Sequence, residues 1–358
     1  MKAIVVAGGT GGHIYPALAI INKIKEKEKD SQILYVGNYD RMEKDIVPKL
    51  GIDFIGLEMA GLNRKNIFKN FSVLFKVSKA YFRAKKIIKD FDPDIVIGAG
   101  GYVSVPVLYA AHKLKYKTVI HEQNSIVGMS NKFLANFADR VFVSFPNSKK
   151  YFSLDKVVFT GNPRSEEIVS VPKISKDFLG FKKDKKLVVF VMGSLGSTTM
   201  TKKIKDMIPN FKNKNYQVLI VTGKSYYDDY KDVFLPNNVK LVPFLDNLIN
   251  LMKDTDLIVS RAGASTIAEI TAIGLASLLV PSPYVTHNHQ YLNAKELEDA
   301  GACKMVLEDS FDSSTVVSLI DEIINDKILC SKLKKASLSF GVRDSATKIY
   351  EEIRKLIG

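Results

Sequence analysis

A histidine at the start of an expected helix is the first residue of the chain with an obvious chemical use. His13 follows a glycine-rich segment, residues 7–12, which joins an apolar strand expected at 2–7 to a helix expected at 16–25, with Pro16 near its first turn. A neutral imidazole in that place can take a proton from a hydroxyl nucleophile, so His13 is a candidate general base. A role as a helix cap or phosphate contact fits the same position equally well.

The glycine-rich segment indicates an anionic ligand. Glycines let backbone amides approach a phosphate closely, and the amino end of the following helix adds a favourable field. The segment lacks the Gly-Lys-Ser/Thr of a Walker A loop. Ile14 stands where a dinucleotide fingerprint starting at Gly9 needs its last glycine. NAD and ATP are therefore not expected, and a tight turn without a ligand is the alternative.

Apolar strands and helical patterns alternate along the chain, and the alternation restarts near its middle. Strands are expected at 2–7, 32–36, 95–98, 118–121 and 140–144, and again at 187–192, 217–222, 239–243, 257–260 and 277–281. Such runs are typical of parallel sheets covered on both faces, so we predict an α/β fold with two Rossmann-like domains. We expect domains at 1–163 and 164–340, and a final helix at 341–358 that crosses back to the first domain or stays with the second.

Composition and charge narrow the class of protein. The chain has 358 residues, of which 46% are hydrophobic and 25% charged, an ordinary globular composition. Its two cysteines exclude a disulfide framework and a cysteine-based zinc ribbon, and favour a reducing compartment. We expect no signal peptide, because a strand begins at Lys2, and no transmembrane span.

The net charge of +14 is unevenly distributed. Residues 1–163 contain 25 basic and 14 acidic side chains, whereas residues 164–358 contain 27 and 24. A basic first half indicates an anionic partner, which could be a phosphate compound, a nucleic acid or a membrane surface.

Several sequence blocks, in order along nearly the whole chain, resemble one family. They are Gly8-Gly9-Thr10-Gly11-Gly12-His13, Gly98-Ala-Gly-Gly-Tyr-Val-Ser-Val-Pro106, His121-Glu-Gln-Asn124, Gly161-Asn-Pro-Arg164, Ser260-Arg-Ala-Gly-Ala-Ser-Thr-Ile-Ala-Glu269 and His289-Gln-Tyr-Leu-Asn-Ala294. Together they resemble the MurG family of N-acetylglucosaminyltransferases of peptidoglycan synthesis. The resemblance implies the GT-B fold, in which two Rossmann-like domains face each other across a cleft.

The resemblance also implies a reaction. N-acetylglucosamine (GlcNAc) would move, with inversion, from UDP-GlcNAc to the 4-hydroxyl of MurNAc in undecaprenyl-pyrophosphoryl-MurNAc-pentapeptide (lipid I), giving lipid II. No cofactor would be required, although a divalent cation could stimulate the reaction. The pair His287 and His289 offers no third metal ligand, and no Asp-x-Asp motif is placed to hold a metal diphosphate, so no metal site is expected.

The family's donor-binding residues carry over to a defined set of positions. They are Thr10, Gly11, Gly12, Asn124, Arg164, Ser194, Ile249, Ala264, Glu269 and Gln290. Among these, Glu269 would bind the ribose hydroxyls and Gln290 the transferred sugar. The loop Met192-Gly193-Ser194-Leu195-Gly196 departs from the family's usual Gly-Gly-Ser-Gln-Gly, so any role of that glutamine side chain is lost.

The acceptor side carries over to the first domain. Gly100, Gly101 and Tyr102, together with the first glycine loop, would hold the acceptor diphosphate. His13 would be the general base, and Glu122 is a weaker alternative for that role.

Residues 64–89 predict a contact with a membrane surface. They contain nine Lys or Arg residues and no acidic residue, with aromatic and aliphatic residues at helical spacing. The expected membrane face comprises Phe71, Leu74, Phe75, Lys79, Phe82 and Arg83. A basic amphipathic helix of this kind binds anionic phospholipids without crossing the bilayer. A core helix with a solvated basic face is the alternative.

The expected location is therefore the cytoplasmic side of the cell membrane, as a peripheral protein. The expected partners are UDP-GlcNAc, lipid I, anionic phospholipids of the inner leaflet and, through the resemblance, the cell-wall or division machinery. Nucleic acid is not expected, because no recognition motif accompanies the charge. The other functions considered are a glycolipid glycosyltransferase, a UDP-GlcNAc epimerase and an inactive membrane-bound scaffold.

Overall fold

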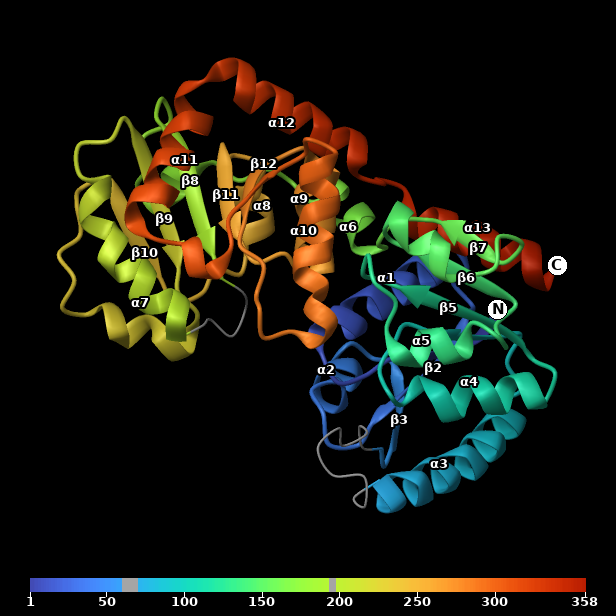
Figure 1. Ribbon diagram of the computed structural model, residues 1–358. Helices are drawn as coiled ribbons and strands as arrows, with labels where there is room; N and C mark the ends of the chain where they lie inside the picture. The colour runs from blue at the N-terminus through green and yellow to red at the C-terminus, as the bar shows by residue number, and fades with distance from the viewer. Residues whose placement is uncertain (60–69, 193–197) are drawn as a thin grey trace. The chain divides into compact units, whose positions relative to one another are not determined.

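The computed structural model describes residues 1–59, 70–192 and 198–358, which form two compact units (Figure 1). Unit 1 comprises Met1–Glu166 and Asp344–Gly358, and unit 2 comprises Glu167–Arg343. Each unit is built around its own parallel sheet, so the predicted α/β class with two Rossmann-like domains is confirmed. The division falls after Glu166, and the final helix belongs to unit 1.

The sheet of unit 1 has seven strands in the order β3-β2-β1-β4-β5-β6-β7. All neighbouring strands pair in parallel. The strands are β1 (Lys2–Val6), β2 (Gln32–Asn38), β3 (Asp53–Leu57), β4 (Ile95–Gly98), β5 (Lys117–Glu122), β6 (Arg140–Val143) and β7 (Val157–Phe159). Strand order reverses beside β1, so the carboxyl ends of β1 and β4 mark the position where open α/β sheets bind ligands.

Helices cover both faces of this sheet because its strands are apolar on both sides. Along β1, Ile4 and Val6 pack into one core, whereas Ala3 and Val5 pack into the other. The helices are α1 (Gly11–Lys27), α2 (Glu43–Lys49), α3 (Asn70–Phe91), α4 (Ser104–Lys113), α5 (Met129–Leu134), the 3₁₀ helix η2 (Pro146–Tyr151), α6 (Arg164–Ser170), which runs across the unit boundary, and α13 (Ser345–Ile357). Helices α3 and α4 lie side by side, and α1 packs against α13 (Figure 1).

The first helix differs from the sequence prediction. It begins at Gly11 rather than at residue 16, so Pro16 lies inside α1 and not in its first turn. Proline has no N–H, and the carbonyl of Gly12 therefore lacks its helical donor. Because α1 starts earlier, His13 lies within its first turn, at the carboxyl end of the central strand β1.

The sheet of unit 2 has six strands in the order β10-β9-β8-β11-β12-β13, again all parallel. The strands are β8 (Lys186–Val191), β9 (Tyr216–Val221), β10 (Val239–Val242), β11 (Leu257–Ser260), β12 (Ala276–Leu279) and β13 (Lys304–Met305). The α-helices are α7 (Thr198–Met207), α8 (Leu248–Met252), α9 (Ala264–Ile273), α10 (His289–Asp299), α11 (Ser313–Asn325) and α12 (Lys327–Phe340). Short 3₁₀ helices are η3 (Lys176–Leu179), η4 (Ile208–Phe211), η5 (Lys224–Tyr230), η6 (Thr286–Asn288) and η7 (Glu308–Ser310).

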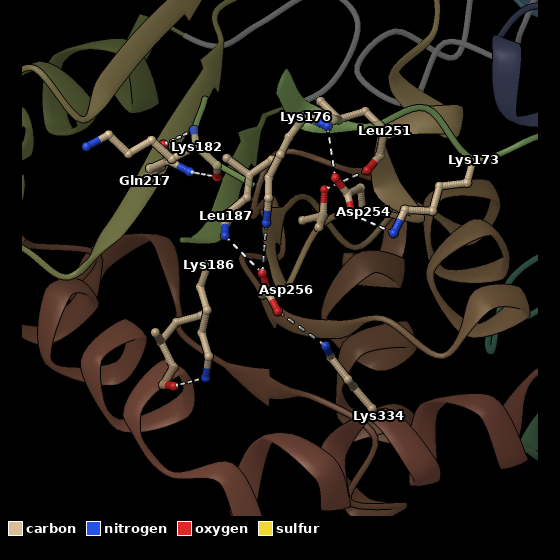
Figure 2. Close-up of polar contacts among 12 residues, drawn as sticks. Lys173, Lys176, Lys182, Lys186, Leu187, Gln217, Leu251, Asp254, Asp256 and Lys334 are labelled. Carbon is tan, nitrogen blue, oxygen red and sulfur yellow. Dashed lines mark hydrogen bonds and ion pairs between the residues drawn. The ribbon is translucent and has the colours of Figure 1, made fainter. Parts of the chain in front are cut away.

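Two carboxylates accept backbone hydrogen bonds near the amino-terminal ends of the strands of this second sheet (Figure 2). Asp256 accepts a hydrogen bond from the backbone N–H of Leu187, 2.9 Å away, and Asp254 accepts one from the N–H of Lys176 at the same distance. A groove of about 360 Å³ lies at this edge, lined by Lys186, Asp256, Lys334 and other residues of α12. It is at the opposite end of the strands from the loops where ligands bind in such sheets.

No helix in the described ranges combines the length and the apolar character needed to cross a bilayer.

Candidate active site

Two glycine loops of unit 1 pack directly against each other. The N–H of Gly8, after β1, donates to the carbonyl of Gly100, after β4, at 3.3 Å. The Ser104 hydroxyl also donates to that carbonyl, at 2.9 Å. Gly100 and Gly101 have φ values of +102° and +91°, which favour glycine. The structure therefore brings the two loops expected to bind phosphate to a single place in unit 1.

His13 is held over this junction by its ring nitrogen Nδ1. That atom lies 3.2 Å from the carbonyl oxygen of Gly8 and 3.4 Å from the hydroxyl of Thr10, the N-cap of α1. A carbonyl oxygen only accepts hydrogen bonds, so the first contact requires the proton to be on Nδ1. The other nitrogen, Nε2, is then unprotonated in the neutral ring. A Cβ at Gly100 would lie 2.9 Å from that nitrogen, so only glycine leaves room for the ring.

A buried carboxylate supports the first glycine loop, and the sequence analysis missed it. Glu43, in the first turn of α2, is fully buried. Its Oε1 accepts from the backbone N–H of Asn38 at 2.9 Å and from the Asn38 side-chain amide at 2.7 Å. Both carboxylate oxygens lie 3.3 Å from the N–H of Gly9. No local motif marks Glu43, since its partners lie at the end of β2 and in the loop after β1.

A second polar network connects β5 to the same junction. His121 is buried, and its Nε2 lies 3.1 Å from the carbonyl oxygen of Gly161. The side-chain nitrogen of Gln123 lies 3.2 Å from His121 Nδ1 and donates to the carbonyl of Ala99 at 2.7 Å. Burial lowers the pKa of His121 to about 4, although the bond to Gly161 acts in the opposite direction. His121 is therefore a neutral structural residue that supports the loop after β5.

Glu122 holds the loop that carries Asn124. Its carboxylate is buried, and Oε1 accepts from the N–H of Asn124 at 3.0 Å. Its Oε2 accepts from the N–H of Gly128 at 3.0 Å and from the side chain of Asn131 at 2.9 Å. Asn124 itself is half-buried beside this carboxylate.

The remaining predicted residues of unit 1 lie in or next to the two glycine loops, or at the start of α6. Thr10 and Gly12 are exposed, Gly11 is half-buried, and Tyr102 is 46% exposed. Arg164 is the first residue of α6 and lies within unit 1, where its guanidinium is 5.5 Å from the centre of the Tyr15 ring. Arg164 thus approaches the amino end of α1.

In unit 2, a buried ion pair fixes the loop after β11. Arg261 Nη2 lies 2.6 Å from Glu308 Oε2, and Nη1 donates to the carbonyl of Val280 at 3.2 Å. These contacts connect the ends of β11 and β12. Ala264 begins α9, and Glu269 lies half-buried on the same helix. The sequence analysis did not find Arg261 or Glu308 because 46 residues separate them.

Helix α10 connects to the same loops. Gln290 Oε1 accepts from the N–H of Ser282 at 2.9 Å, and this bond turns the amide nitrogen away from Ser282. Asn293, fully buried, donates to the carbonyl of Ala262 at 3.3 Å. Ile249 is half-buried in α8. Ser194 lies outside the described residues.

The outward face of α3 carries both apolar and basic side chains. Phe75 is 72% exposed and Phe82 is 65% exposed, and Lys79 and Arg83 are also exposed. The opposite face of the helix buries Val73, Ala80, Ala84 and Ile88. The backbones of Phe71 and Leu74 belong to α3, but their side chains lie outside the described residues.

An aromatic cluster continues from this face across α4 to α5. Phe82 packs on Tyr81, Tyr81 on Tyr109, and Tyr109 on Phe133, with ring centres 5.4, 5.8 and 6.2 Å apart. Phe133 is 46% exposed, and Met129 beside it on α5 is 48% exposed. The exposed apolar surface is therefore wider than α3 alone. In the described part of the chain, no three His, Cys, Asp or Glu side chains gather as metal ligands.

Comparison with known proteins assigns both units to one family. Residues 3–143 match the glycosyltransferase family 28 N-terminal domain, and residues 187–349 match the glycosyltransferase family 28 C-terminal domain. The chain is 42% identical, over the full length of both proteins, to the UDP-N-acetylglucosamine--N-acetylmuramyl-(pentapeptide) pyrophosphoryl-undecaprenol N-acetylglucosamine transferase of Bacillus cytotoxicus. It is 43% identical, also over both full lengths, to transferase 1 of the same description from Bacillus cereus.

Solved structures agree with these matches. The crystal structure of MurG from Acinetobacter baumannii superposes with a TM-score of 0.81 and 26% identity, covering 99% of each chain. A putative UDP-N-acetylglucosamine 2-epimerase from Listeria monocytogenes gives a TM-score of 0.72, covering 99% of this chain and 96% of its own. At 13% identity, that second likeness shows the fold alone.

Proposed function

This chain belongs to the MurG family of N-acetylglucosamine transferases, and from that premise we propose how its residues carry out the reaction. The enzyme transfers GlcNAc from UDP-GlcNAc to lipid I in peptidoglycan synthesis, as the full-length identity of 42% to the named transferases supports. The observation that carries the mechanism is the position of His13, fixed through Nδ1 at the junction of the two glycine loops.

The reaction is a single displacement at the anomeric carbon of the donor. The 4-hydroxyl oxygen of MurNAc forms the new bond, the bond from the anomeric carbon to the diphosphate breaks, and UDP leaves. The hydroxyl proton goes to Nε2 of His13, which the bond from Nδ1 to Gly8 leaves unprotonated. The amides of the glycine loops face the acceptor diphosphate, beside Gly100, Gly101 and Tyr102.

Glu122 is less suited than His13 to accept this proton. Its oxygens already accept hydrogen bonds from Asn124, Gly128 and Asn131, and its side chain is buried. Protonation would weaken those bonds, because a carboxylic acid has fewer acceptor sites than a carboxylate. We assign Glu122 the role of positioning Asn124, which contacts the sugar.

The donor binds mainly to unit 2 in this proposal. Glu269 accepts hydrogen bonds from the ribose hydroxyls, as acidic residues do in related nucleotide folds. Gln290 donates its amide N–H to a hydroxyl of GlcNAc, since its oxygen is engaged by Ser282. Ile249, Ala264 and Ser194 complete this donor set, with Thr10, Gly11, Gly12 and Arg164 contributed by unit 1.

The exposed face of α3 holds the enzyme on the membrane that carries its acceptor. A core helix with a solvated face would not expose Phe75 and Phe82 as fully as this helix does. Lys79 and Arg83 lie among these rings and favour anionic phospholipids. The proposed location is thus peripheral, on the cytoplasmic side of the cell membrane.

The decisive experiment measures transfer of label from UDP-GlcNAc to a short-chain lipid I analogue. UDP-glucose and UDP-galactose serve as controls. We expect transfer from UDP-GlcNAc alone, a loss of about 10²- to 10⁴-fold in kcat for His13→Gln, and weaker donor binding for Glu269→Ala. An unchanged kcat in His13→Gln would exclude His13 as the base.

A further inference from the structure

Glu43 and His13 contact opposite ends of one peptide group. The N–H of Gly9 lies 3.3 Å from each carboxylate oxygen of Glu43. The carbonyl of Gly8, which belongs to the same peptide group, lies 3.2 Å from Nδ1 of His13. The result is a continuous chain from the carboxylate, through the Gly8–Gly9 peptide, to the imidazole.

The environment makes this chain electrostatically significant. Glu43 is fully buried, and no ion pair to it is found among the residues that the structure describes. Its charge is instead balanced by N–H donors of Gly9 and Asn38. In a partly buried chain of hydrogen bonds each bond polarises the next, so the carboxylate strengthens the Gly8 carbonyl as an acceptor. A stronger acceptor at Nδ1–H raises the proton affinity of Nε2.

We propose that Glu43 is a positioning residue for the transferase, acting on His13 through the Gly8–Gly9 peptide. The carboxylate fixes the orientation of that peptide and, with it, the Nδ1–H tautomer of His13. It also makes Nε2 a stronger base than an imidazole facing an unpolarised carbonyl. The arrangement resembles the carboxylate that orients a catalytic histidine in hydrolases, with a peptide group inserted between the two side chains. This inference rests on the proposed role of His13 as the base.

Several other titratable groups lie in the same part of unit 1 as Glu43 and His13. Tyr35, on β2, is buried near Glu43, and burial together with that carboxylate raises the pKa of its hydroxyl. Tyr102 follows the second glycine loop, and Tyr15 and Arg164 pack together at the amino end of α1 and the start of α6. Because removing a negative charge can affect all of these groups, the effect of a Glu43 variant must be compared with that of removing another negative charge from α2.

The first test needs no variant. Long-range ¹H–¹⁵N spectra of the enzyme labelled with ¹⁵N-histidine distinguish the two neutral tautomers, and only five histidines are present. Comparison with His13→Gln assigns the signal of His13. We expect the Nδ1–H form at neutral pH. An Nε2–H form would overturn the proposal, because the bond to Gly8 could not then exist.

The second test compares Glu43→Gln with two controls in the same assay. Asp45→Asn removes an exposed carboxylate from the same helix. Asn38→Ala removes the buried hydrogen bond from the Asn38 side chain to Glu43 but keeps the charge of Glu43. In Glu43→Gln we expect the pKa of His13 to fall by about 1 and kcat to fall about 10- to 100-fold, with little change in KM for UDP-GlcNAc. Asp45→Asn should leave both unchanged, and Asn38→Ala should leave the pKa unchanged.

Two outcomes separate this inference from the proposed function. If the wild-type enzyme transfers GlcNAc but the pKa of His13 is the same in Glu43→Gln, the inference is wrong and the function stands. If the wild-type enzyme does not transfer GlcNAc to the lipid acceptor, the proposed function itself fails. Thermal unfolding of each variant shows whether it is folded. If Glu43→Gln does not fold, the tautomer of His13 in the wild-type enzyme is the test of the inference.

Discussion

Gly101 lies so close to the carbonyl oxygen of Gly8 that a Cβ added at position 101 would be only 2.4 Å from it. The contact is between two backbones, so neither side can move aside as a side chain would. The φ of +91° at Gly101 adds a conformational cost for any other residue. The distance between the two glycine loops is therefore set by Gly101.

We predict that Gly101→Ala destabilises unit 1 by more than about 2 kcal/mol and reduces transfer strongly, since strain and steric overlap add. The matched control is Gly51→Ala, where φ is +67° and nothing lies within 4 Å of the new Cβ. That variant should lose only about 1 kcal/mol and keep its activity. Urea unfolding measures both, and equal losses in the two variants would contradict the argument.

The buried His121 predicts a loss of stability in mild acid. Its pKa of about 4 in the folded protein is below the ordinary 6.5, so the unfolded chain binds a proton that the folded protein does not between these values. Stability therefore falls as the pH decreases from about 6.5 to about 4, by about 3 kcal/mol from this group. Above pH 6.5 the contribution is constant.

The measurement is urea unfolding at pH 7.5 and pH 5 for the wild type and His121→Gln. His121→Gln should be less stable than the wild type at both pH values. The difference in free energy of unfolding between the two proteins should be smaller at pH 5 than at pH 7.5. A difference that does not depend on pH would show that His121 does not titrate as burial requires.

Removing one partner of the pair Arg261–Glu308 should lower the free energy of unfolding more than replacing both partners with apolar residues. Glu308→Leu leaves a buried guanidinium beside an apolar group, and we expect a loss of about 3–5 kcal/mol. Arg261→Met should behave similarly, for the complementary reason. The double variant should be more stable than the sum of the two single changes implies. Additive losses in urea unfolding would show that the two residues act independently.

The exposed aromatic residues of α3 predict a defect confined to membrane binding. Phe75→Asp or Phe82→Asp should weaken binding to anionic vesicles about tenfold or more, because a ring no longer enters the lipid surface. Turnover of a water-soluble acceptor analogue should persist. Phe234→Asp is the matched control, since Phe234 is 77% exposed in unit 2 and the charge change is the same. Equal vesicle binding by all variants in a flotation assay would exclude this face.

The regular parts of the fold were predictable because their signal is local. The strands expected at 95–98 and 257–260 are confirmed as β4 and β11 with the same bounds. Both are short, buried and bounded by glycine or by polar residues. The sequence analysis missed β3, β7 and β13. Strand β3 is a half-buried edge strand containing Gly56, β7 is a half-buried edge strand of three residues, and β13 has only two residues. Such strands are defined by their neighbours rather than by their own pattern.

The residues of the candidate site fall into the same two groups, those with a local sequence signal and those without one. Motif residues such as His13 and Gly100 could be found from the glycine-rich segments that follow strands and from the resemblance of those segments to the family, and the structure brings the two residues together. Glu43 and Glu308 could not, because each appears in the sequence as an ordinary acidic residue near the start of a short helix. Only the tertiary structure reveals that their carboxylates are buried against distant loops.

Unit 1 is discontinuous in the sequence, and this affects how it folds. Helix α13 joins it through Thr347, which donates to Glu166, and through Tyr350, whose hydroxyl donates to Glu28 at 2.9 Å. Residues 344–358 are synthesised only after the whole of unit 2. During translation, unit 2 can therefore complete its core first, while the unit that was begun earlier leaves one face of its sheet partly uncovered until α13 leaves the ribosome.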